Sequence, residues 1–319
     1  MSFVSRGLPH HAERLYLTDG GIETSLIFDQ GMDVPHFAAF DLLRHEQGRA
    51  ALARYYEPYL TIATQAGFGF VLESPTWRAN SDWADRLGYS IAALRATTID
   101  AIQFMHSLRH KYETPGTPMI VSGCVGPRGD GYAAGEAMTP KAADAYHDSQ
   151  IDAMVGAGCD LVTAITMTNV PEAIGIARAA ARHGAPCVIS FTVETDGHLP
   201  SGARLDKAIT AVDEGTDCPP AYYMINCAHP THFVDALTPG QSWTTRLGGV
   251  RANASCRSHA ELDGAAELDR GDPAQLAAEY HMLAERFPHL RVFGGCCGTD
   301  HRHISAIAAA LRAGAVHPV

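Results

Sequence analysis

The chain has 319 residues, of which 46% are hydrophobic and 18% charged, so it can bury a large core and is not a long disordered chain. It carries 24 Lys and Arg against 35 Asp and Glu, a formal net charge of −11, and lacks a basic block, which argues against a nucleic-acid or anionic-membrane partner. No apolar run approaches the roughly 18 residues of a membrane span, and residues 1–13 lack the apolar segment of a secretory signal. We therefore expect a cytoplasmic protein whose eight cysteines are reduced thiols.

Short runs rich in Val, Ile and Leu alternate with longer helical patterns along the chain. The runs predict strands at residues 15–18, 69–73, 119–123, 160–165, 186–193, 221–225, 247–251 and 290–293. The helical patterns cover residues 46–66, 83–112, 140–156, 171–183, 203–214, 231–237, 273–287 and 301–313. Thr139-Pro140 and Asp272-Pro273 fit an N-cap followed by Pro at a helix start, and Ser81 and Asp82 precede the second helix.

Eight strands alternating with eight helices predict a parallel sheet that closes as a (β/α)8 TIM barrel. An open doubly wound sheet is the alternative, but Gly20-Gly21-Ile22-Glu23 after the first strand is not the Gly-rich motif of a nucleotide-binding version. The length alone suggests two domains, yet no stretch resembles a linker, so we expect one domain over residues 1–319 with residues 1–14 as a lead-in. The long loops at 126–138 and 255–272 should serve at the catalytic face as lids or as contacts in a homo-oligomer.

Three cysteines follow strands whose ends are close neighbours in such a barrel. Cys227 follows the sixth strand, and Cys296 and Cys297 follow the eighth, at the face where barrel enzymes carry their chemistry. Adjacent cysteines need a sharp turn to bind one ion, and the flanking glycines at 294, 295 and 298 provide backbone freedom. Three thiolates with one open position are typical of a catalytic zinc.

Packing is the alternative role for cysteine. We expect Cys124, Cys159, Cys187, Cys218 and Cys256 to be small buried side chains without a function. A rival metal set would add His301 or His303, which follow the cysteine pair, but these positions suit a solvated or capping first helical turn.

Several sequence elements are shared with one known family. They are Asn226-Cys227, the run Gly294-Gly295-Cys296-Cys297-Gly298-Thr299, the run from Thr18-Asp19-Gly20-Gly21 to Thr24, the segment from Glu73 to Asn80, Gly126-Pro127, and Asn253. Together they resemble the homocysteine S-methyltransferase family over residues 15–311. The double-cysteine motif with its upstream Asn-Cys is highly specific, whereas each other element is weak alone.

The resemblance implies methyl transfer to a thiol at a zinc held by Cys227, Cys296 and Cys297, because zinc stabilises a bound thiolate. It also implies that Asp19, beside Gly20, binds the ammonium group of the acceptor, although an N-cap or turn role fits the same motif. Asn226 and Asn253 would position the substrate or groups around the metal. Trp77 or Tyr132 would face the cationic methyl donor, with packing in a lid as the equally good alternative.

The sequence departs from the family after the fourth strand, where many members carry a Glu that helps hold the ammonium group. Ile165 stands at that position, so either Glu73 or Glu194 replaces its charge or the acceptor is not homocysteine. Arg78 stands in the loop after strand two, where it would bind a carboxylate or form a surface ion pair.

The length leaves no room for folate or cobalamin modules, and the shorter relatives favour a sulfonium donor such as S-methylmethionine or S-adenosylmethionine. We therefore expect methionine to be made from homocysteine. The alternatives are another small thiol or a selenol as acceptor, betaine or dimethylsulfoniopropionate as donor, a zinc-dependent barrel hydrolase, and a non-enzymatic zinc-binding or redox protein. A hydrolase would carry His-x-His after strand one, which is missing here.

Overall fold

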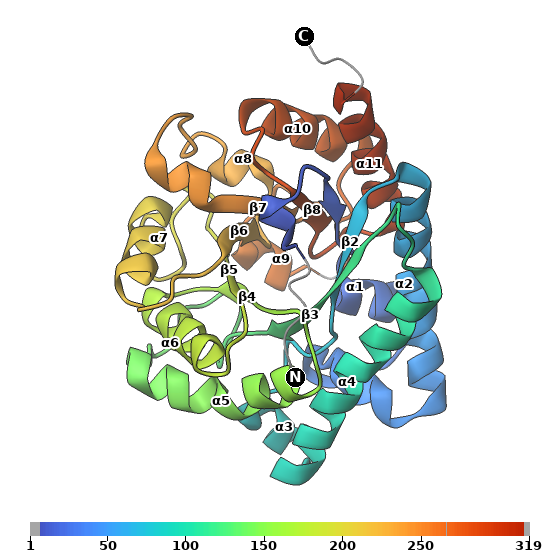
Figure 1. Ribbon diagram of the computed structural model, residues 1–319, viewed down its shortest axis with the longest axis vertical. Coiled ribbons are helices and arrows are strands. Elements are labelled where there is room, and N and C mark those ends of the chain that lie inside the picture. The colour runs from blue at the N-terminus through green and yellow to red at the C-terminus, as the bar shows by residue number, and fades with distance from the viewer. Residues whose placement is uncertain (1–6, 266, 316–319) are drawn as a thin grey trace.

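The computed structural model describes residues 7–265 and 267–315. Eight parallel strands close into a barrel in the order of the sequence, with helices around the outside (Figure 1). The strands are β1 (Tyr16–Leu17), β2 (Gly69–Glu73), β3 (Met119–Val125), β4 (Leu161–Met167), β5 (Cys187–Phe191), β6 (Tyr222–Asn226), β7 (Leu247–Ala252) and β8 (Val292–Gly295). Residue Tyr16 pairs with Gly69 on one side and Val292 on the other, which closes the ring. The predicted (β/α)8 barrel is therefore confirmed, and the strand boundaries differ from the prediction by no more than about two residues.

The helices form a layer around the strands, as Figure 1 shows. They are α1 (Ile22–Phe28), α2 (Glu46–Ala66), α3 (Ser81–Arg86), α4 (Ile91–Tyr112), α5 (Pro140–Gly156), α6 (Val170–Arg182), α7 (Leu205–Glu214), α8 (Pro230–Phe233), α9 (His259–Asp263), α10 (Pro273–Arg286) and α11 (His301–Ala315). Short 3-10 turns lie at Pro9–His11, Pro35–Phe37, Ala39–Arg44 and Ser242–Arg246. The predicted caps are confirmed at two helix starts, where Thr139 accepts from the Ala142 amide and Asp272 accepts from the Ala274 and Gln275 amides.

One predicted helix, residues 83–112, is wrong as a continuous element. The chain ends α3 at Arg86 and begins α4 at Ile91, and between them Gly88 adopts a φ of +73°, which a side chain would disfavour. The side chain that caps α3 is Asn80, not Ser81 or Asp82, and it accepts from the Trp83 amide. The short α1 and α9 also lie in regions for which the sequence pattern predicts no helix.

The interior of the barrel is layered, because strand side chains alternate between its two faces. Its lower layer is an apolar cluster that includes Val71, Val188 and Val292. Two residues further along six of the eight strands, the inward positions are polar: Glu73, Ser122, Thr163, Ser190, Asn226 and Arg251 are all buried there. The carboxyl ends of the strands therefore surround a buried polar chamber, and the apolar layer lies beneath it. A barrel enzyme has its active site at this end of the strands.

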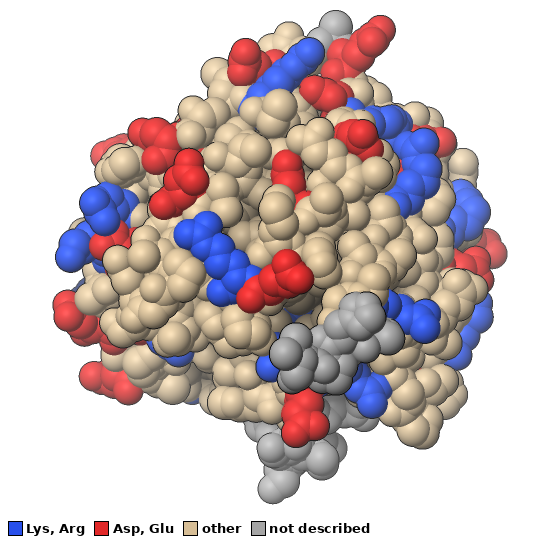
Figure 2. Space-filling view, turned by 90° about the horizontal axis from the view of Figure 1, so that it is seen from above, with Lys and Arg blue, Asp and Glu red and all other residues tan. Residues whose placement is uncertain are grey.

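The predicted loops at 126–138 and 255–272 lie at the chamber. Asp130, Tyr132, Ser255 and Leu268 from these loops line the same cavity as the strand ends. On the face drawn in Figure 2, acidic and basic side chains are scattered without a broad basic area. Within the described residues, no helix combines the length and apolar character needed to cross a bilayer.

Candidate metal centre

The three cysteines singled out by the sequence converge at the top of the barrel. The Sγ atoms of Cys227, Cys296 and Cys297 all lie within 4.8 Å of one another. Cys227 leaves β6 with a φ of +52°, and Thr166 opposite it has a φ of +64°. Non-glycine residues rarely adopt this conformation, and where they do so they often mark functional sites.

The glycines around the cysteine pair have two different roles. Only Gly298 adopts a positive φ, of +80°, so backbone freedom explains this one residue. Gly294 and Gly295 are needed for space, because an added Cβ would collide with the side chains of Thr18 and Thr299 respectively. The expectation that all three supply conformational freedom is therefore wrong for Gly294 and Gly295. These two instead allow the backbone of the turn to pack closely against Thr18 and Thr299.

Cys227 and Cys296 are joined by a disulfide, and Cys297 is a free thiol. This contradicts the expectation that all eight cysteines are reduced. Zinc binds cysteine as thiolate, so the disulfide and a metal held by both residues exclude each other. The reduced set nevertheless fits the ion, because a tetrahedral site with Zn–S bonds of about 2.3 Å separates sulfurs by roughly 3.8 Å, within the spacing of this cluster.

The rival ligands do not join the cysteines. His303 is buried and contacts Asp300 and the Arg270 carbonyl, whereas His301 is exposed. Among the residues that the structure describes, the three cysteines are the one group of three or more His, Cys, Asp and Glu that can hold a metal ion.

Tyr132 links the loop after β3 to this cluster. Its hydroxyl donates to the Sγ of Cys297 at 3.2 Å, and its ring stacks on His259 at 4.3 Å between centroids. The His259 ring in turn lies 2.6 Å from the Cys227 carbonyl. Burial raises the pKa of Cys297, and the hydrogen bond from Tyr132 counters part of this shift. The Tyr132 hydroxyl therefore favours the anionic form of the Cys297 thiol.

The two asparagines predicted at the site contact two of the cysteines. Asn226 accepts from the Thr166 amide at 2.9 Å and from Ser190 Oγ at 2.6 Å, while its Nδ2 approaches Cys296 Sγ at 3.9 Å. Asn253 donates to the Cys227 carbonyl at 3.1 Å. Neither is among the residues that line the cavity, so the structure favours a supporting role over direct substrate contact.

The other predicted substrate residues do line one cavity of about 400 Å³, together with the three cysteines. They are Asp19, Gly20, Glu73, Trp77 and Arg78. Gly20 packs so closely that a Cβ there would lie 2.7 Å from the Thr299 carbonyl oxygen. The structure therefore brings together elements from β1, β2, β6 and β8, as the strand-end argument predicts.

Asp19 already has two partners within the protein. Arg251 Nη2 donates to Asp19 Oδ1 at 2.6 Å, and the Tyr55 hydroxyl donates to Oδ2 at 2.9 Å. Burial raises the pKa of Asp19, opposed by the charge of Arg251 and by the Tyr55 hydrogen bond. The sequence analysis did not identify Arg251 as a site residue. The feature that could have identified it is a charged residue near the end of a predicted barrel strand.

Two further carboxyl groups near this pair form no direct ion pair with any residue that the structure describes. Burial raises the pKa of Glu73 to about 7, and burial likewise raises the pKa of Glu23, at the start of α1, to about 7. Both line the cavity, as does Ile165 at the position where the family's acid was expected. Glu194 is not among the lining residues, and its Oε1 lies 3.3 Å from His259 Nδ1. Of the two acids expected to replace the family's Glu, Glu73 is therefore the one that lines the cavity with Ile165.

Arg78 occupies the ring face that Trp77 would offer to a cation. Its guanidinium lies 4.2 Å from the centroid of the Trp77 ring and 3.8 Å from that of Trp83, and its Nη1 donates to the Gly129 carbonyl at 2.7 Å. Burial lowers the pKa of Arg78 to about 10. This stacking fits neither the predicted surface ion pair nor an aromatic face open to the donor.

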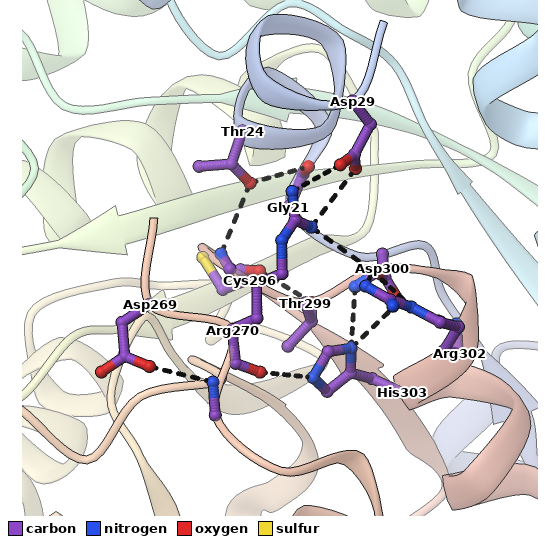
Figure 3. Close-up of polar contacts among 12 residues, drawn as sticks. Gly21, Thr24, Asp29, Asp269, Arg270, Cys296, Thr299, Asp300, Arg302 and His303 are labelled. Carbon is purple, nitrogen blue, oxygen red and sulfur yellow. Dashed lines mark hydrogen bonds and ion pairs between the residues drawn. The ribbon is translucent and has the colours of Figure 1, made fainter. Parts of the chain in front are cut away.

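A polar network secures the cysteine turn from outside (Figure 3). Asp300 accepts from the Arg302 amide at 2.8 Å and contacts His303 at 3.1 Å. Arg270, from the loop after β7, bridges Asp300 and Asp29 of the segment after α1. Burial alone would raise the pKa of Asp300, but hydrogen bonds from His303 and Arg302 hold it well below its usual range.

The remaining cysteines follow the packing expectation in part. Cys124, Cys159 and Cys187 are buried, but Cys218 and Cys256 are exposed. Packing is therefore wrong for the last two.

Comparison with known proteins points to one family and one fold. The family model described as homocysteine S-methyltransferase matches residues 16–311. Two structures of the homocysteine methyltransferase MmuM from Escherichia coli, in a metallated and an oxidized form, each superpose with a TM-score of 0.75 at 20% identity. The alignments cover 96% of this chain and 99% and 98% of those chains. At this identity the likeness shows the fold. No curated protein sequence matches the chain.

Proposed function

Because the chain belongs to the homocysteine S-methyltransferase family and is therefore a methyltransferase, we propose that it makes methionine from homocysteine. The proposed donor is a sulfonium compound, S-methylmethionine or S-adenosylmethionine, and the proposed cofactor is zinc held by Cys227, Cys296 and Cys297. The observation that carries this proposal is the convergence of three Sγ atoms within 4.8 Å at the edge of one cavity. The disulfide must be reduced before these residues can hold the ion.

Zinc bound there would supply a Lewis acid that keeps the acceptor thiol deprotonated near neutral pH. The acceptor sulfur then forms a bond to the methyl carbon while the bond from that carbon to the sulfonium sulfur breaks. The thiol proton leaves to solvent, and the donor departs as a neutral thioether.

The chain's own residues prepare this transfer. Asn226 and Asn253 hold the cysteine backbone and side chains in place, and Tyr132 covers the cluster and donates to Cys297. Such fixed geometry lowers the entropic part of the barrier. The two loops line the same cavity, where they would limit the access of water to the reacting groups.

The charge of the cavity supports a cationic donor. Glu23 lines it without a direct cationic partner among the described residues, and the rings of Phe28 and Phe37 lie at its edge, 50% and 48% exposed. Carboxylates and aromatic faces both stabilise a sulfonium or ammonium group. A metal-dependent hydrolase has less support, because the described residues hold no His- and Asp-rich metal group.

A product screen by mass spectrometry tests the proposal. The reduced, zinc-loaded protein would be mixed with homocysteine, selenohomocysteine or other small thiols, each crossed with S-methylmethionine, S-adenosylmethionine, dimethylsulfoniopropionate and betaine. We expect methionine to form fastest from homocysteine and a sulfonium donor. Transfer to another thiol, or from betaine alone, would replace the proposed substrates, and no transfer in any pairing would refute the proposal.

A further inference from the structure

Two buried side chains of opposite charge line the cavity, and each has one atom without a hydrogen-bond partner among the described residues. They are Arg251 on β7 and Glu73 at the end of β2, which are 6% and 4% exposed. Arg251 Nη1 and Glu73 Oε2 have no hydrogen-bond partner within the described part of the chain. Buried polar atoms nearly always have a hydrogen-bond partner. An unpaired donor on Arg251 and an unpaired acceptor on Glu73, both lining one cavity, therefore indicate a ligand that pairs with both.

Arg251 is held in a fixed orientation. Its Nη2 donates to Asp19 at 2.6 Å and its Nε donates to the Gly295 carbonyl at 3.2 Å. These two contacts fix the plane of the guanidinium and leave Nη1 as the free donor. A carboxylate is the group whose geometry and charge suit such a donor.

Glu73 is placed to accept from a cation. The Tyr56 hydroxyl donates to its backbone carbonyl at 2.8 Å, while the side chain projects into the polar layer of the barrel. Asp19 is already paired directly with Arg251, whereas Oε2 of Glu73 has no hydrogen-bond partner among the described residues. Ile165 adds an apolar wall to the same cavity.

The charges also determine what kind of ligand fits. A simple carboxylate would meet Arg251 but face the negative charges of Asp19 and Glu73, and a simple amine would meet Glu73 but face Arg251. A zwitterion carries both groups and adds no net charge to a buried site, which avoids the cost of an uncompensated ion.

We propose that Arg251 and Glu73 are the specificity-determining residues of the acceptor site, with Arg251 binding the α-carboxylate and Glu73 the α-ammonium of a thiol amino acid. The inference rests on the proposed function in so far as the ligand is the methyl acceptor. It moves the ammonium contact away from Asp19, whose carboxylate instead orients Arg251.

Calorimetric titration of the reduced, metal-free protein tests this assignment without requiring catalysis. The probes are methionine, 4-(methylthio)butanoate, which lacks the ammonium group, and 3-(methylthio)propylamine, which lacks the carboxylate. The variants are Arg251→Gln, Arg251→Lys and Glu73→Gln. Arg109→Gln is the matched control, because it removes a half-buried ion pair with Asp160 that is remote from the cavity.

Loss of one charge-assisted hydrogen bond should weaken binding by roughly 10- to 100-fold. We expect Arg251→Gln to weaken methionine and 4-(methylthio)butanoate by this factor and to spare 3-(methylthio)propylamine, with a smaller loss in Arg251→Lys. Glu73→Gln should weaken methionine and the amine and spare the butanoate. Glu73→Gln is nearly isosteric, so it tests the assignment even where Arg251→Gln does not fold.

Equal weakening of all three probes in Glu73→Gln, or no change in any, would overturn the assignment. Failure of the proposed function has a different signature. A protein that shows these binding preferences but methylates no thiol would refute methyl transfer and leave the assignment intact. If the protein methylates homocysteine while Glu73→Gln keeps the wild-type binding preferences, the proposed function stands and the assignment of Glu73 is refuted.

Discussion

Arg251 Nη2 lies 2.6 Å from Asp19 Oδ1, although the two residues are 232 positions apart in the chain. The contact reaches from β7 to the turn after β1, past β8, whose end is followed by Cys296 and Cys297. Both side chains are almost fully buried, at 7% and 3% exposed. A buried pair of this kind is expensive to desolvate and contributes little stability by itself, which favours a role in the site over one in holding the barrel together.

Removal of one cysteine should abolish metal binding. In the reduced protein, we expect Cys297→Ala to fall from one zinc per chain to well below one and to lose methyl transfer by roughly 100-fold or more, because a ligand is lost outright. Elemental analysis and a methionine assay measure the two effects. Cys218→Ser is the control, since Cys218 is an exposed free thiol, and it should keep both. A metal-replete Cys297→Ala variant with full activity would refute the proposed centre.

Loss of the Tyr132 hydroxyl should raise the pKa of Cys297. Its hydrogen bond at 3.2 Å favours the thiolate, so Tyr132→Phe removes that stabilisation without removing the ring that stacks on His259. In reduced, metal-free protein, alkylation of Cys297 followed by peptide mass spectrometry should need a higher pH in the variant. Tyr112→Phe, whose hydroxyl contacts Glu57 at the surface, should leave the alkylation profile unchanged. An unchanged profile in Tyr132→Phe would show that the hydroxyl does not act on the thiol.

The sequence was sufficient to predict that the three cysteines meet at the ends of the strands, but it was not sufficient to predict which buried charges pair with each other. The positions of Cys227, Cys296 and Cys297 follow from the alternation of strands and helices, because the carboxyl ends of all strands meet at one face. The Asp19–Arg251 contact depends on which inward side chains can reach across the barrel, which no local pattern records. The break between α3 and α4 depends on one residue, Gly88, whose positive φ the helical periodicity around it conceals.

Glu73 should make the protein less stable as the pH rises. Its pKa is raised to about 7 from an ordinary value near 4.5, so between these pH values the folded state binds more protons than the unfolded state. Stability is therefore lost as the pH rises through this window, by on the order of 1–3 kcal/mol. Urea unfolding of wild type and Glu73→Gln at pH 5 and pH 8 measures it: the free energy of unfolding of wild type should fall relative to the variant. A pH-independent difference would show that the carboxyl is not perturbed in this way.

Asp300 should stabilise the turn that carries the cysteine pair. Asp300→Asn weakens charge-assisted contacts with Arg302, His303 and Arg270 (Figure 3), so we expect the free energy of unfolding to fall by about 1–3 kcal/mol at neutral pH. Asp217→Asn, at an exposed site, should have little effect. Denaturant unfolding of both variants provides the comparison, and equal stability of Asp300→Asn and wild type would exclude the network as a support of the turn.

The central claim is that the three cysteines hold zinc and leave one position for the acceptor thiol. X-ray absorption at the zinc edge tests it most directly, using reduced, zinc-loaded protein with and without homocysteine. We expect three sulfur neighbours at about 2.3 Å in the free protein and four once homocysteine is added. A shell with fewer than three sulfurs in the free protein, or one that homocysteine leaves unchanged, would contradict the claim.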